Sequence, residues 1–74
     1  MKNQYYIKPF HSEFINTYDK AWHDAITDIK LFCYDDAMNN FKTLADEIIN
    51  LADYYYANGY FCALCQYASD NKLI

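Results

Sequence analysis

The sequence contains no arginine, and its six lysines are outnumbered by ten aspartates and glutamates, giving a formal charge of −4. Proteins that bind nucleic acids directly neutralise phosphates with cationic side chains and read base edges with arginine above all. An acidic chain without arginine is poorly equipped for either task. We therefore expect no direct contact between this protein and nucleic acid.

Glycine and proline each occur once in the 74 residues, and no long apolar run is present. Loops that cradle phosphates need several glycines, and a membrane span needs roughly 18 or more apolar residues in succession. Three cysteines, an odd number, fit a reducing compartment better than a disulfide scaffold. We expect a soluble, cytoplasmic protein that binds no nucleotide and spans no membrane.

The cysteines are the residues that most resemble a chemical site. Cys62 and Cys65 are spaced as C-x-x-C, a pattern that redox proteins and zinc sites share. Only Ala-Leu separates them, however, and Cys33, His11 and His23 supply no second pair of ligands. We favour simple packing of these thiols and predict no enzyme, cofactor or metal site. A thiol redox or metal-binding protein remains an alternative.

Apolar residues make up 54% of the chain and return at spacings of three and four, which predicts an all-α fold. Residues 12–33 carry one such stripe. Residues 36–58 carry a wider one, suited to two neighbours, and it contains Met38, Phe41, Ala45, Ile48, Ala52 and Tyr55. Residues 1–11 lack helical periodicity and include the only proline, so we expect an extended arm there.

The stretch YYYANGYF at residues 54–61 admits two interpretations. Asn58-Gly59 could form the turn of a β-hairpin, or it could end a helix with Gly59 in the left-handed conformation. Because the helical stripe continues through Tyr55, we favour the helix end and a separate third helix at 60–70. The predicted fold is a small three-helix bundle in one domain, 1–74, with two long antiparallel helices, a short third helix and an N-terminal arm.

Nine tyrosines exceed what a core of this size readily accommodates, because each buried hydroxyl needs a hydrogen-bond partner. Tyrosine is also enriched in protein-binding surfaces. Carboxylates accompany the tyrosines on the predicted helices, and they form either an acidic contact patch or only a solvated face. We predict a protein interface formed by Tyr54, Tyr60, Tyr67, Asp53, Glu47, Asp24 and Asp28.

These features predict a non-enzymatic intracellular protein that binds another protein and inhibits or modulates it. A partner with a basic nucleic-acid-binding surface would suit the acidic charge. Small acidic inhibitors that phages and mobile elements direct against CRISPR or restriction systems have this general character. A homodimeric structural or regulatory module is the alternative.

Overall fold

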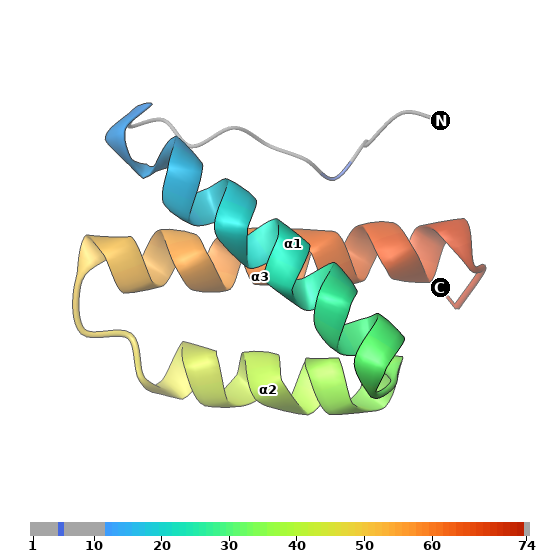
Figure 1. The fold of residues 1–74 in the computed structure, drawn as a ribbon. Coiled ribbons are helices and arrows are strands. Elements are labelled where there is room, and N and C mark those ends of the chain that lie inside the picture. The colour runs from blue at the N-terminus through green and yellow to red at the C-terminus, as the bar shows by residue number, and fades with distance from the viewer. Residues whose placement is uncertain (1–4, 6–11, 74) are drawn as a thin grey trace.

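The computed structural model describes residue 5 and residues 12–73 (Figure 1). A 3₁₀ turn, η1 (Ser12–Phe14), leads into α1 (Ile15–Leu31), which is followed by α2 (Tyr34–Asp46) and α3 (Leu51–Asp70). No strand occurs in these described segments. The predicted all-α three-helix bundle is confirmed. Of the predicted arm only Tyr5 is described, and its backbone N–H donates to the Gln66 side chain at 3.2 Å; residues 1–4 and 6–11 lie outside the described part.

The longest helix, α3, occupies the centre of the bundle (Figure 1). In this view α1 crosses in front of α3 at an angle, and α2 lies beside α3 and runs antiparallel to it. Tyr18, Tyr60 and Leu64 are the largest fully buried side chains, and they lie in the core cluster formed mainly by α1 and α3. The core is therefore concentrated where α1 crosses α3.

The predicted second helix, 36–58, is wrong, because residues 47–50 are not helical and α3 begins at Leu51. Asn50 is the N-cap of α3, and its side-chain oxygen accepts from the backbone N–H of Asp53 at 2.9 Å. The Asp53 carboxylate in turn accepts from the N–H of Ile49 at 3.2 Å. The first bond satisfies a backbone donor that the first turn of a helix leaves unpaired, and the second holds the residue before the cap against that turn. The capping residue Asn50 thus starts a new helix, although the apolar stripe in the sequence continues without a break.

The end of the first predicted helix also differs, because α1 stops at Leu31 and α2 starts at Tyr34. Cys33 adopts an extended conformation between them, and its sulfur accepts from the backbone N–H of Asp36 at 3.4 Å. A residue predicted to close one helix therefore caps the next.

Asn58 and Gly59 lie in the middle of α3, so both the hairpin and the helix end at this position are wrong, as is a separate helix at 60–70. Gly59 has no positive φ. A Cβ placed on Gly59 would lie 2.5 Å from the backbone oxygen of Tyr18. The glycine is needed because the backbones of α1 and α3 approach closely there, and the fully buried Ala21, Ala25 and Ala63 belong to the same cluster.

We predict that Gly59→Ala destabilises the protein by about 1 to 3 kcal/mol, because the added methyl group forces α1 away from α3. In an open helix the same change would stabilise by roughly 0.5 to 1 kcal/mol, so the sign of the effect is diagnostic. The free energy of unfolding from urea denaturation measures it. Thr27→Ala, at an exposed position of α1 outside the crossing, is the control and should have little effect. A more stable Gly59→Ala variant would contradict the close approach.

Candidate protein interface

The three tyrosines predicted at an interface occupy different environments. Tyr54 is 49% exposed, whereas the side chain of Tyr60 is completely buried, so the prediction that Tyr60 is exposed is wrong. Tyr67 is half-buried, and its ring stacks on Tyr34 with 5.7 Å between centroids. The helix that was predicted to present Tyr60 to a partner is instead the central helix, and α1 and α2 cover that side of it. Of the three, Tyr54 is the one that is largely exposed.

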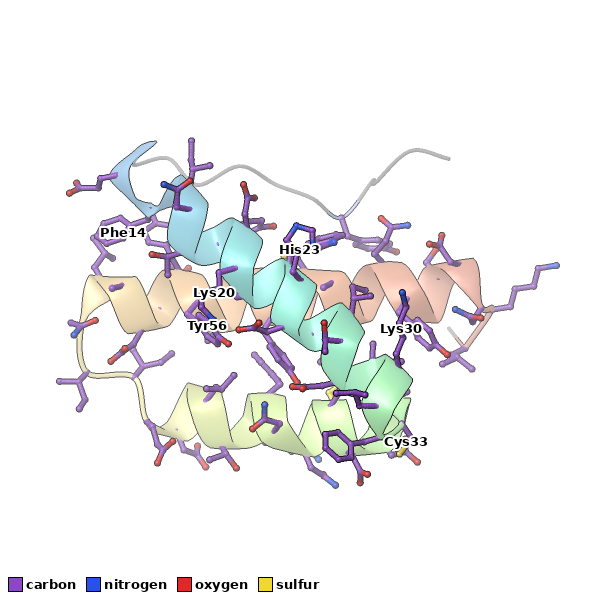
Figure 2. All side chains as sticks on the ribbon, viewed as in Figure 1. Phe14, Lys20, His23, Lys30, Cys33 and Tyr56 are labelled. Atoms are coloured by element: carbon purple, nitrogen blue, oxygen red, sulfur yellow. The ribbon has the colours of Figure 1, made fainter. Side chains whose placement is uncertain are left out.

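Two hydrogen bonds between tyrosine and aspartate join α1 to α3. The Tyr56 hydroxyl donates to Asp24 at 2.5 Å, and the Tyr60 hydroxyl donates to Asp28 at 2.6 Å. Asp24 and Asp28 are one turn apart on α1, and Tyr56 and Tyr60 are one turn apart on α3. The two bonds therefore repeat in register. Figure 2 shows Tyr56 between α1 and α3 with Lys20 beside it, and Lys20 forms an ion pair with Asp24 at 3.0 Å.

These bonds shift the protonation of the groups that form them. The hydrogen bond from Tyr56 lowers the pKa of Asp24 below its ordinary value. Burial, reinforced by the bond to Asp28, raises the pKa of Tyr60 to about 12, and burial together with Asp24 raises the pKa of Tyr56 further still. Asp24 and Asp28 were predicted as contact residues, but in this structure they hold two helices together.

Carboxylates nevertheless gather on this side of the bundle, which we call the acidic face. One surface hollow is lined by Leu44, Glu47, Asp53 and Tyr56. A second is lined by Asp28, Phe32, Asp36, Ala37 and Asn40. The two Tyr–Asp pairs connect the hollows, because Tyr56 lines the first and Asp28 the second. The acidic face therefore brings together four of the predicted acids and one that was missed, namely Asp24, Asp28, Glu47, Asp53 and Asp36.

A different surface, which we call the apolar face, lies along the groove between α2 and α3. The groove holds about 140 Å³ and is lined by Phe41, Ala45, Ile48, Tyr54, Ala57, Asn58 and Phe61. None of these residues is charged. Phe41 and Phe61 have ring centroids 4.9 Å apart, and Ile48 and Phe61 are each 40% exposed. The volume is below the roughly 300 Å³ of a typical small-molecule pocket, so it suits a single side chain.

The two faces occupy different sides of α3 and adjoin where Asp53 lines the first hollow and Ala57, one turn later, lines the groove. Tyr54 lines the groove, and Tyr56 lines the first acidic hollow. Two positions along an α-helix correspond to a rotation of about 200°. Sequence analysis combined Tyr54 with the acids in one interface, but the structure places it on the other side of the helix.

The three cysteines occupy different environments. Cys33 is exposed, and Cys62 and Cys65 are half-buried on successive turns of α3. Burial raises the pKa of the Cys65 thiol, which disfavours the reactive thiolate. Among residue 5 and residues 12–73, no group of three or more His, Cys, Asp or Glu side chains is placed to hold a metal ion.

No protein-family model, curated protein or solved structure matches this chain. None of the described helices is both long and apolar enough to cross a membrane. The function is therefore inferred from the acidic and apolar faces themselves.

We expect the two Tyr–Asp pairs to make the folded protein less stable as the pH becomes alkaline. Below the ordinary tyrosine pKa of 10.0 the hydroxyls are protonated in both the folded and the unfolded chain, so their contribution is intact. As pH rises from 10.0 towards about 12, the unfolded chain ionises while Tyr60 in the folded chain resists, and the free energy of unfolding should fall. Urea denaturation across this range measures the effect.

Tyr56→Phe should make the fall in the free energy of unfolding at alkaline pH smaller. At neutral pH it should lower that free energy by about 1 to 2 kcal/mol, because a hydrogen bond to a carboxylate is lost. Tyr54→Phe is the matched control, since Tyr54 lies in the groove and outside both pairs. The hydrogen bond from Tyr56 stabilises ionised Asp24, so its contribution should also disappear in acid as pH falls through the lowered pKa of Asp24. Equal alkaline losses in Tyr56→Phe and the wild type would contradict this role.

The three cysteines should differ in reactivity. We expect iodoacetamide at neutral pH to modify exposed Cys33 well before Cys65, because burial keeps the Cys65 thiol protonated. Peptide mass spectrometry over a time course gives the order. Equally fast labelling of both thiols in the folded protein would show that Cys65 is activated and would favour a redox role.

Proposed function

We propose that this protein binds another protein through its acidic face and inhibits or modulates that protein without catalysis. The supporting observation is the gathering of five carboxylates around two adjoining hollows. Among the described residues, Lys20 alone forms an ion pair with them, and it does so at Asp24. Such a surface carries an uncompensated negative field, and that field attracts cationic partners.

Each hollow also offers an apolar contact beside its carboxylates. Leu44 lies with Glu47 and Asp53 in one, and Phe32, which is 68% exposed, lies with Asp36 in the other. Binding energy in protein interfaces comes mainly from buried apolar and aromatic anchors, while charges steer the approach and select the partner. The acidic face has both components, so it suits a protein partner with a basic surface.

A surface that binds nucleic acid is basic, because it must neutralise phosphates. The specific form that we propose is an inhibitor that occupies such a surface, in the manner of anti-CRISPR and anti-restriction proteins. A non-enzymatic role fits the chemistry of this face, since the hydroxyls of Tyr56 and Tyr60 are hydrogen-bonded to carboxylates and have raised pKa values.

The double variant Asp36→Lys, Glu47→Lys tests this proposal. Both residues are exposed, and neither side chain forms a hydrogen bond that stabilises the fold. We expect it to lose the partner that the wild type captures from a lysate of the native host, with capture quantified by mass spectrometry. With purified partner, the association rate should fall by about tenfold or more, and added salt should slow the wild type as well.

The matched control is Glu13→Lys, which reverses an exposed charge in η1, outside the acidic face. It should bind the partner as the wild type does. If the partner normally binds nucleic acid, adding the wild-type protein should displace that nucleic acid. Equal capture by the wild type and the double variant would refute the proposal.

A further inference from the structure

The apolar face is left uncovered by the bundle. Tyr54, Phe61 and Ile48 are each at least 40% exposed around the groove, and Leu51, at the start of α3, is 46% exposed. In Figure 1, α1 crosses only one side of α3, and no residue of α1 lines the groove between α2 and α3. We propose that this face is where two copies of the chain join as a homodimer.

The distribution of charge favours a second copy over a basic partner. From Tyr54 to Ser69, α3 carries no charged residue, and none lines the groove. A lysine or arginine brought to this face would lose its hydration and find no carboxylate in exchange. A second copy brings an equally uncharged face, and the cores of homodimer interfaces are depleted of charge in this way.

The net charge of −4 does not oppose this arrangement. Tyr56, in the first acidic hollow, lies about 200° around α3 from Tyr54 in the groove. Two copies joined through their apolar faces therefore keep Asp24 and Asp28, which bond to Tyr56 and Tyr60, outside the contact. Charges separated by more than about 10 Å in water are largely screened at ordinary salt concentrations.

The shape of the face also suits a two-fold contact. Ala45 and Ala57 are the small residues of a hollow that is flanked by the large side chains of Tyr54 and Phe61. In a symmetric dimer, each copy supplies the same protrusion and the same recess. Asn58 also lines the groove, and its amide can both donate and accept, so it can pair with its own copy and fix the register.

Sedimentation equilibrium over a range of concentrations tests the proposal, with reductant present so that exposed Cys33 forms no intermolecular disulfide. The wild-type mass should rise from 8.8 kDa towards twice that value. Tyr54→Glu and Tyr54→Lys should each raise the dissociation constant at least about tenfold, because like charges then meet across the two-fold axis. An equimolar mixture of these two variants should recover the dimer, since opposite charges meet instead.

Leu31→Glu is the matched control, because Leu31 is a 69% exposed apolar residue at the end of α1, outside the groove. It should dimerise as the wild type does. Circular dichroism checks that each variant is folded. Should the Tyr54 variants lose helicity through their edge-on contact with Tyr55, Ile48→Glu and Ile48→Lys replace them, since Ile48 lies in the loop and also lines the groove.

Several results would overturn the proposal. These are a wild-type protein that stays monomeric at its highest soluble concentration, charged variants that still dimerise, or a mixture that fails to recover the dimer. A monomeric wild type that loses a captured host protein on Tyr54→Glu would assign the face to a different partner. The Asp36→Lys, Glu47→Lys variant should still dimerise, which separates this test from that of the acidic face.

Discussion

The close approach of Gly59 to the backbone of Tyr18 is the contact on which the rest of the bundle depends. Because no side chain separates the two helices there, α1 lies directly on α3, and Ala21, Ala25 and Ala63 are fully buried in the same cluster. Large side chains then pack around the crossing rather than at it. Among them is Tyr60, whose hydroxyl reaches Asp28 on α1. The glycine thus determines both the separation of the helices and the register of their polar contacts.

The same crossing divides the surface. α1 covers one side of α3, and no residue of α1 lines the groove between α2 and α3. Carboxylates on α1, such as Asp24 and Asp28, meet tyrosines of α3 on the covered side. Tyr54 and Phe61 lie on the uncovered side, where no charged residue lines the groove. An acidic face and an apolar face therefore follow from the placement of one helix.

Helical periodicity predicted the fold class correctly, because spacings of three and four report on which side of a helix is buried, and that signal accumulates over many residues. The helix ends were predicted less well, since they depend on single hydrogen bonds. Asn50 followed three residues later by Asp53 is a readable start signal, but it lies inside a continuous apolar stripe. That stripe led us to extend one helix across residues 47–50.

Gly59 shows a limit of a different kind. Asn-Gly is typical of a hairpin turn and also of a helix end. Neither structure forms here, because the glycine is needed for contact with another helix. Glycine is needed at position 59 because the backbone of Tyr18, 41 positions earlier in the chain, lies against it. No pattern in the neighbouring sequence reveals that contact. The absence of charge between Tyr54 and Ser69 can be read from the sequence, but it does not tell which side of α3 meets the acids, because Tyr56 and Tyr60 lie in the same stretch.

The acidic and apolar faces have different consequences for a partner because they occupy different sides of α3. A homodimer joined through the apolar face would present two acidic faces, directed away from each other. Binding the first basic site would then raise the effective concentration of the second acidic face near any neighbouring basic site. The gain depends on the spacing between those sites, since a rigid dimer can engage both only when the geometry fits. A two-fold symmetric or repetitive basic target would meet that condition, and an isolated basic patch would gain nothing from the dimer.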